Sequence, residues 1–427
     1  MNDDARPTEW DEVVSNSALN SHTLNVYNHP SPNVLVVIEA EIATTQLVGQ
    51  IVDCCAAWGV RSATRLLDEL SAADLAPRTI PIFIRCGDPL AQIWTEALTR
   101  AGRCYVYYID DNFWKISGDS LLANYYRHRI VRRSLEFSIS HAEAVITNSA
   151  ELAEFLAQFS AKVSVLPSFF DFSLVADVSA QDLIAADDQE IRIGFAGSPS
   201  RASDLDIVAP LIPKVLERYP NVVFEFIGAW PNGLGATDRI RLFPHMSDYK
   251  AYIRFQLDRR WTIGLAPLLD HEANRAKTDN KYREYGAFRC AGIYSAIPPY
   301  SYVVTKSVTG LLVDNSEAAW LDALTDLLGN PAKREAIAQQ ALEDVKHKYD
   351  IQRVADRWAT FFLKLASNLP ADARAIDEVR LKRSRLKALL CRLWLHIDTM
   401  HQQGGWRLVI KRANRKLGRF LARQLSR

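Results

Sequence analysis

The ten residues IRIGFAGSPS (191–200) divide the sequence into two halves with the same pattern. They are typical of a buried β-strand that leads into a turn rich in glycine, serine and proline, and a polar stretch at 177–190 precedes them. Apolar strands that alternate with helices indicate a parallel sheet covered on both faces. The sequence therefore predicts an α/β fold of two doubly wound, Rossmann-like domains that face a cleft. The other expected strands lie at 33–40, 79–86, 105–110, 144–149, 163–168, 222–229, 261–268, 292–296 and 309–314.

The helices expected between these strands lie at 45–58, 90–101, 120–140 and from 316 to 366. The length of 427 residues also favours more than one hydrophobic core. We expect five parts: a polar N-terminal segment (1–30), an N-terminal domain (31–176), a C-terminal domain (190–345), a helix that crosses back to the first domain (346–368) and a helical tail (371–427).

The composition is that of an ordinary globular protein, with 48% hydrophobic and 24% charged residues. Apolar runs fall short of the roughly 18 residues that span a bilayer, and the acidic start is unlike a signal peptide. Six scattered cysteines without a CxxC pair favour reduced, mostly buried thiols. These features together predict a cytoplasmic protein.

The tail carries charge of the opposite sign to the body. Residues 371–427 hold 15 Lys+Arg against 4 Asp+Glu, although the whole chain has a net charge of only +1. Apolar residues at helical spacing alternate with basic ones, Gly404 and Gly405 interrupt, and a second basic helical stretch follows. The apolar set is Leu386, Leu389, Leu390, Leu393, Trp394 and Ile397, and the basic set is Lys382, Arg383, Arg385, Lys387 and Arg392.

Basic amphipathic helices with tryptophan suit an anionic membrane surface, so residues 379–425 predict peripheral binding to the inner face of the plasma membrane. The same stripe also fits docking on the acidic body or on a partner subunit. Nucleic acid is disfavoured as a partner, because the tail lacks the interleaved aromatic residues of a stacking platform.

Two common nucleotide motifs are absent. No GxGxxG follows the first strand, which disfavours a dehydrogenase, and no GxxxxGK[ST] is present, which disfavours a P-loop enzyme. Because ligands of doubly wound folds bind where the strands end, the turns after the strands hold the candidate residues.

The stretch AKTDNKYREYGAFRC (276–290) follows one such strand. Thr278 or Asp279 is expected to cap a helix. Lys277 and Lys281 then share a face beside free backbone N–H groups, which suits a diphosphate, and Glu284 can accept bonds from sugar hydroxyls. The same spacing also fits a solvated helix start with one Lys/Glu pair.

Two further turns offer polar groups. After 191–196, Gly197 lets the backbone approach a ligand, and Ser198 and Arg201 supply donors, although such residues also make plain tight turns. After 105–109, Asp110 or Asp111 could orient an acceptor hydroxyl or act as a base. For either aspartate alone, an Asx turn is the better interpretation.

The order of IGFAGSPS, VVFEFIG, the stretch around 276–296 and TGLLVDNSEAAWLDALTDLL resembles the C-terminal half of group-1, family 4-like retaining glycosyltransferases of GT-B fold. The similarity covers roughly 190–365. It implies a nucleotide diphosphate sugar as donor, with Glu284 on the ribose, Lys277 and Arg201 near the diphosphate and Gly197 and Ser198 beside it. It further implies a glycan or lipid-linked saccharide as acceptor near Asp110 or Asp111 and a role in surface polysaccharide synthesis. It implies neither a metal nor a cofactor.

The sequence departs from the family pattern at one important place. The earlier glutamate of the family's pair falls on Ala276. A catalytically degenerate binding or scaffold subunit therefore stays open. A second alternative is another cleft enzyme of the same architecture, a non-hydrolysing nucleotide-sugar epimerase.

Overall fold

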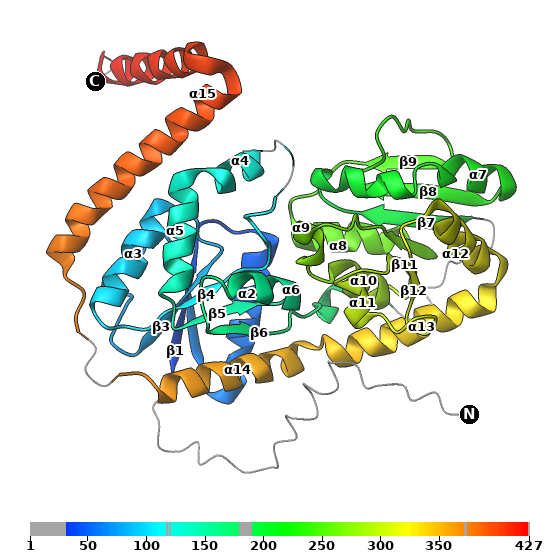
Figure 1. Ribbon diagram of the computed structural model, residues 1–427, viewed down its shortest axis with the longest axis horizontal. Helices are drawn as coiled ribbons and strands as arrows, with labels where there is room; N and C mark the ends of the chain where they lie inside the picture. Colours follow the sequence, from blue (N-terminus) through cyan, green and yellow to red (C-terminus); the bar gives the residue numbers. More distant parts are fainter. Residues whose placement is uncertain (1–30, 117, 119–120, 179–189, 371–373, 426–427) are drawn as a thin grey trace.

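The computed structural model describes residues 31–116, 118, 121–178, 190–370 and 374–425. The expected segment at 1–30 and most of the linker at 177–190 lie outside them. Each half of the chain forms a six-stranded parallel sheet, and Figure 1 shows the two halves next to each other with helices around each sheet. The predicted α/β fold of two doubly wound domains is confirmed.

The first sheet has the strand order β2-β1-β3-β4-β5-β6. Its strands are β1 (Asn33–Ile38), β2 (Arg61–Leu66), β3 (Thr79–Ile84), β4 (Val106–Tyr108), β5 (Ala144–Thr147) and β6 (Val163–Val165). Its helices are α2 (Ala43–Cys54), η2 (Cys55–Trp58), α3 (Pro89–Arg100), α4 (Leu121–Arg127), α5 (Arg129–Ser140) and α6 (Ala150–Leu156), and the short η3 (Phe172–Val175) follows β6.

The second sheet has the order β12-β11-β10-β7-β8-β9. Its strands are β7 (Ile191–Ala196), β8 (Val222–Ile227), β9 (Ile240–Phe243), β10 (Ile263–Ala266), β11 (Ala291–Ser295) and β12 (Leu311–Val313). Its helices are η4 (Pro199–Ile207), α7 (Leu211–Arg218), α8 (Tyr249–Asp258), α9 (Glu272–Arg275), α10 (Asn280–Ala287), α11 (Tyr300–Val303), α12 (Glu317–Gly329) and α13 (Pro331–Lys348).

Two edge strands were not expected from the sequence, and one expected helix is divided. β2 and β9 were not expected: both lie at sheet edges, and β2 (RSATRL) is polar and mostly exposed, so no buried apolar run marks it. The single helix expected at 120–140 is two, because His128 adopts extended backbone geometry (ψ 132°) and its Nδ1 accepts a bond from the N–H of Ile130, which starts α5.

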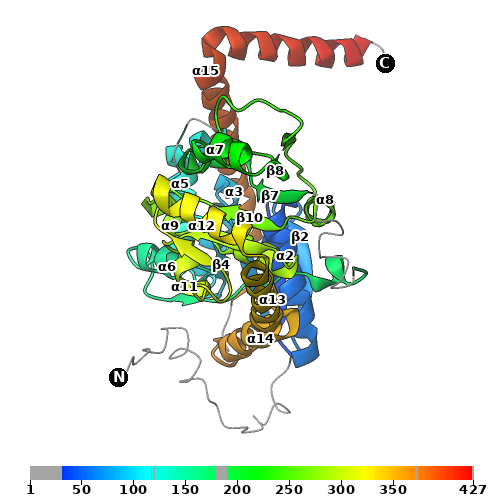
Figure 2. The ribbon, with the colours of Figure 1, turned by 90° about the vertical axis from the view of Figure 1, so that its right-hand side faces the viewer.

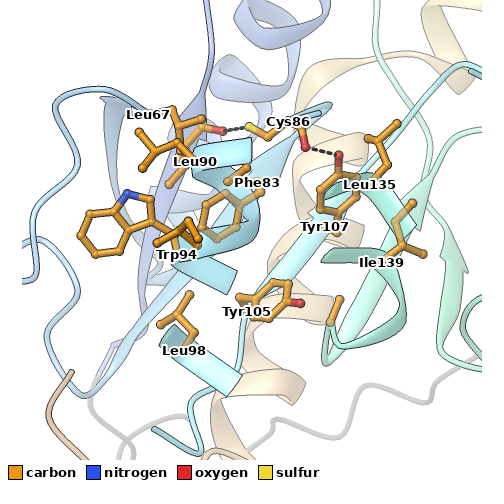
Figure 3. Close-up of a cluster of buried hydrophobic side chains, with 14 of the residues drawn as sticks. Leu67, Phe83, Cys86, Leu90, Trp94, Leu98, Tyr105, Tyr107, Leu135 and Ile139 are labelled. Atoms are coloured by element: carbon orange, nitrogen blue, oxygen red, sulfur yellow. Dashed lines mark hydrogen bonds between the residues drawn. The ribbon is translucent and has the colours of Figure 1, made fainter. Parts of the chain in front are cut away.

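The core of the first domain is an apolar cluster between α3, α5 and one face of the sheet (Figure 3). Trp94 and Phe83 are fully buried in it. The Tyr107 hydroxyl donates to the carbonyl of Cys86 at 2.8 Å, so a buried phenol keeps a hydrogen bond where the chain leaves β3. This packing fixes the position of the residues that follow β3 and β4.

Helix α14 (Ile351–Ser367) returns to the first domain after the second is complete. Asp350 caps it by accepting bonds from two backbone N–H groups. Trp358 packs with Val36 and Ile82 of the first sheet, and its Nε1 donates to the carbonyl of Pro167 at 2.9 Å. The crossing helix therefore completes the core of the domain that the chain formed first.

Helix α15 (Glu378–Leu425) follows, and it lies along α3 (Figure 1). Two stretches separated by Gly404 and Gly405 were expected, whereas the helix is continuous. It changes direction in its later part (Figure 1), and Gly405 has a φ of +63°. Its last part projects away from both sheets (Figure 2). Among the described residues, no helix is both long and apolar enough to cross a membrane.

Replacing Trp358 with alanine tests the role of the crossing helix. The side chain is 1% exposed, so Trp358→Ala should lower the free energy of unfolding by about 3–5 kcal/mol through lost burial and the cavity left behind. Urea titration followed by circular dichroism measures this loss. Thr360→Ala, on the exposed side of the same helix, is the control and should stay within about 0.5 kcal/mol; equal losses in the two variants would contradict the assignment.

Candidate functional site

The candidate residues follow strands of both sheets and come together at the domain interface. Asp110 and Asp111 follow β4, and Gly197 and Ser198 follow β7. The positive charge of Lys277, in the second domain, acts on the carboxyl group of Asp111, in the first. On the surface, the Lys115 ammonium lies 2.5 Å from the Glu272 carboxylate and joins the two domains directly.

Helix α10 supplies two of the candidates. It begins after Asp279, one of the two caps expected from the sequence. Lys281 lies in its first turn with its Nζ 4.7 Å from the centre of the Phe195 ring, and the buried Glu284 lies almost one turn further. The Tyr252 hydroxyl donates to Glu284 Oε2 at 3.1 Å. Lys281 thus lies against the end of β7, and its charge acts on Glu284 of the same helix.

Arg201 is buried in η4, and its Nε lies 2.9 Å from Asp204 Oδ2. The other oxygen of Asp204 accepts bonds from the backbone N–H of Leu269, at 2.8 Å, and from Asn274 Nδ2, at 2.9 Å. Asp204 therefore fixes both the arginine and the loop after β10. Sequence reasoning missed Asp204; its only signal was a carboxylate three residues after Arg201.

Arg85 is the central residue on the first domain's side, and sequence reasoning missed it as well. Its Nη1 lies 3.1 Å from Asp110 Oδ1 and its Nη2 lies 3.2 Å from Asp111 Oδ2. The Thr44 hydroxyl donates to the second oxygen of Asp110 at 2.8 Å. Arg85 has a positive φ of 53°, which a residue without special support rarely adopts. A single arginine directly after the apolar strand TIPIFI was the available signal.

The two aspartates have different electrostatic environments. Burial raises the pKa of Asp110 above its ordinary value, although Arg85 opposes that effect. Burial acts in the same direction on Asp111, but Arg85, Lys277 and Arg201 outweigh it and lower the pKa of its carboxyl group. Asp111, whose side chain is 36% exposed, is therefore a carboxylate whose negative charge is stabilised by cations of both domains.

The lysines are poorly neutralised in the protein alone. Burial and the nearby Arg201 lower the pKa of Lys281 to about 7. Burial also lowers the pKa of Lys277, although Asp111 opposes it. Burial raises the pKa of Glu284, against the charge of Lys281. Perturbed groups gathered at one point in this way are typical of binding and catalytic sites.

The glycine turn after β7 lies against the turn after β8. The N–H of Gly197 donates to the carbonyl of Ile227 at 2.9 Å. Gly228 has a φ of +78°, and a Cβ atom there would come within 2.3 Å of the Gly197 carbonyl oxygen. Ser198 and Ser200 bond each other through their hydroxyls at 2.8 Å. This arrangement leaves a compact, side-chain-poor surface beside Arg201.

The arrangement can hold an anion. The charges of Arg201 and Lys277 act on Lys281 in the first turn of α10, and a helix start is a general binding place for anions. Ala276 has no polar side-chain group to offer a ligand. It is 1% exposed and packs with the apolar cluster of the first domain. Among the described residues, no group of three His, Cys, Asp or Glu side chains has the arrangement of a metal site.

No protein-family model and no curated protein sequence matches this chain. Solved structures do. Sucrose-phosphate synthase from Thermosynechococcus elongatus has a TM-score of 0.59 at 13% identity over 79% of this chain and 99% of its own. HepE from Anabaena, in complex with UDP, has a TM-score of 0.56 at 13% identity over 78% and 100%. A glycosyltransferase from Rickettsia africae has a TM-score of 0.53 at 11% identity over 80% and 100%. The chain shares their two-domain GT-B fold, as the sequence resemblance implied.

Replacing Lys281 with methionine tests the electrostatics of the site through stability. The folded pKa of about 7 lies below the ordinary 10.5, so the unfolded chain holds this proton more tightly. The lysine therefore opposes folding fully below about pH 7, and that cost falls as the pH rises toward about 10.5. Lys281→Met should stabilise the protein more at pH 6 than at pH 10, by roughly 1–3 kcal/mol after allowance for partial exposure.

Chemical denaturation of wild type and variant at the two pH values measures the difference. Lys250→Met, at an exposed position of α8, is the matched control and should show the same small effect at both. If Lys281→Met shows no dependence on pH, Lys281 does not have the lowered pKa that the cluster requires.

Proposed function

We propose that the protein is a glycosyltransferase that transfers a sugar from a nucleotide diphosphate sugar to an acceptor. One observation carries the proposal: the cations of Arg201, Lys277 and Lys281 converge at the start of α10, opposite the ionised Asp111 of the other domain. The structural neighbours support it, because they include glycosyltransferases and one, HepE, in complexes with UDP and with UDP-glucose.

The donor would lie on the second domain. Lys277, Lys281 and the amides at the start of α10 would bind the diphosphate, and Arg201, held by Asp204, would add a fixed positive charge. Glu284, held by Tyr252, would accept bonds from the ribose hydroxyls. Gly197 and Ser198 would let the backbone approach the phosphates.

The chemistry we propose is electrostatic. Negative charge grows on the nucleotide diphosphate as its bond to the sugar breaks, and cations already in position stabilise that charge without reorganising. Lowered lysine pKa values fit this role. The bound diphosphate supplies the negative charge with which these lysines can pair. Asp111 would orient the acceptor hydroxyl or take its proton, and Asp110, held by Arg85 and Thr44, would position Asp111 through their shared guanidinium.

The finer features of the proposal come from the sequence resemblance. They are retention of the anomeric configuration, transfer of a hexose without a metal ion, an acceptor that is a glycan or a lipid-linked saccharide, and a role in surface polysaccharide synthesis. The positive charge that the protein supplies at the proposed diphosphate site agrees with a metal-independent reaction.

A catalytically degenerate binding subunit is the second candidate. The observation that favours it is the burial of Ala276, which leaves no carboxylate at the position where the family resemblance places one. A nucleotide-sugar epimerase is the third, and it would need no acceptor.

The first test is nucleotide binding. A panel of nucleoside diphosphates is screened by thermal shift, and the best one should stabilise the protein by about 2.7 kcal/mol at a hundred times its Kd. Lys277→Ala should weaken its binding about 10- to 100-fold, because a charge-assisted bond to phosphate is lost. Glu284→Gln should weaken the binding of a nucleoside diphosphate that has its ribose hydroxyls more than that of an analogue whose ribose lacks them. Lys250→Ala is the control, and undiminished binding by Lys277→Ala would remove that residue from the site.

The second test is turnover with a panel of nucleotide sugars and saccharide acceptors. Asp111→Asn should lower kcat about a hundredfold or more and leave the Kd for the nucleotide within about threefold, because only the acceptor side changes. Excess EDTA should leave the wild-type rate unchanged. Product analysis separates the candidates: nucleotide binding without transfer or hydrolysis by the wild type identifies a binding subunit, and conversion of the donor sugar without an acceptor identifies an epimerase.

A further inference from the structure

Helix α15 has apolar residues on two opposite sides. Leu381, Ala388 and Leu395 repeat every seven residues, are at most 7% exposed, and belong to the apolar cluster of the first domain. This inner side fixes the helix against α3. The sequence-based alternative of docking on the acidic body therefore describes this side of the helix.

Charged groups hold the inner side in place. Arg392 lies 2.7 Å from carboxylate oxygens of both Asp68 and Asp88. The guanidinium of Arg385 lies 5.9 Å from the centre of the Trp94 ring. These two of the five basic residues expected to surround the exposed stripe therefore face the body of the protein and are not available to an outside partner.

The outer side carries the larger apolar stripe. At about 100° per residue, Leu386, Leu390 and Leu393 lie on the side of the helix away from Ala388. Each is 54–61% exposed, although residues of this type are usually buried. The exposed apolar side chains of this part of α15 are Val379, Leu386, Leu389, Leu390, Leu393 and Trp394.

Basic residues border this stripe. Arg380, Lys382, Arg383 and Lys387 are exposed on the same stretch of helix, and Glu378 is the only acidic residue between 378 and 394. A helix with a wide apolar face and basic borders lies in the headgroup region of a bilayer, with its apolar side chains among the acyl chains and its cations near anionic headgroups. Tryptophan is favoured at that boundary.

We propose that this outer side of α15, from Val379 to Trp394, is a surface that binds an anionic lipid bilayer while the inner side stays docked on α3. A second copy of the chain is the main competing occupant. Charge disfavours it, because pairing two such stripes would bring two sets of four exposed cations together, and Glu378 is the only acidic residue of each stretch. An anionic bilayer complements both the apolar residues and the cations.

The docked side of the helix also sets what the bilayer would face. Asp88, which binds Arg392, is the N-cap of α3 and lies three residues after Arg85. It therefore follows β3, at the same end of the first sheet as Asp110 and Asp111. A bilayer on the outer side of α15 would therefore lie beside the domain to which we assign the acceptor. The surface does not depend on the donor site, so the two proposals can fail separately.

The experiment is co-sedimentation of the full-length protein with vesicles of phosphatidylcholine alone or mixed with phosphatidylglycerol. We expect wild type to bind the anionic vesicles at least tenfold more tightly than the neutral ones, with binding that weakens as salt is added. Leu386→Asp/Leu390→Asp should reduce that binding at least tenfold. Val165→Asp/Val308→Asp is the matched control, because both valines are comparably exposed, at 41% and 45%, away from α15.

A second variant, Lys382→Gln/Arg383→Gln/Lys387→Gln, keeps the apolar stripe and should lose the preference for anionic over neutral vesicles. Circular dichroism and nucleotide binding confirm that each variant is folded. Wild type that ignores both kinds of vesicle, or a Leu386→Asp/Leu390→Asp variant that binds as wild type does, overturns the proposal. So does a lipid-free dimer, measured by light scattering, that the same double substitution converts to monomers.

Discussion

The site depends on ion pairs between charged side chains that the fold brings together at a partly buried interface. Parallel strands of both sheets deliver their carboxyl ends to the domain interface, where charged side chains lose part of their hydration. Arg85 forms ion pairs with two aspartates of the first domain, whereas burial lowers the pKa values of Lys277 and Lys281 of the second. At the domain interface, the first domain thus presents ion-paired carboxylates, and the second presents cations that can bind an anion.

Much of the fold could be predicted from the sequence, because buried parallel strands are continuous apolar runs that turn residues end. The strand and glycine-rich turn at 191–200, which begin a second series of strands and helices, indicated the second sheet. The N-cap of α10 is Asp279, one of the two positions expected from the sequence. The edge strand β2 was not predicted because its side chains face water and its sequence is that of a polar loop. The break at His128 escaped because a backbone ψ angle, not a residue type typical of breaks, separates α4 from α5.

The candidate site was partly predictable for a similar reason. Lys281 and Glu284 could be grouped because helical spacing places them near one another. Lys277 precedes α10, so the loop before this helix, and not helical spacing, brings it near them. Arg85 and Asp204 could not be predicted, because their roles depend on partners that only the folded chain brings near: Asp110 lies 25 residues from Arg85, and Asn274 lies 70 residues from Asp204. The two sides of α15 show the same limit. Its sequence gives one basic amphipathic pattern, but the contact with α3 decides that Arg392 faces inward and Leu390 outward.

The return of α14 to the first domain has a consequence for biosynthesis. Trp358 and Phe362 cover Val36 and Ile82, which leave the ribosome roughly three hundred residues earlier. In a nascent chain that ends after the first sheet, α2 covers this apolar face only in part until α14 has been translated. The first domain therefore cannot complete its core during synthesis before α14 has been translated. Between synthesis of the first sheet and synthesis of α14, chaperones can recognise its exposed apolar surface.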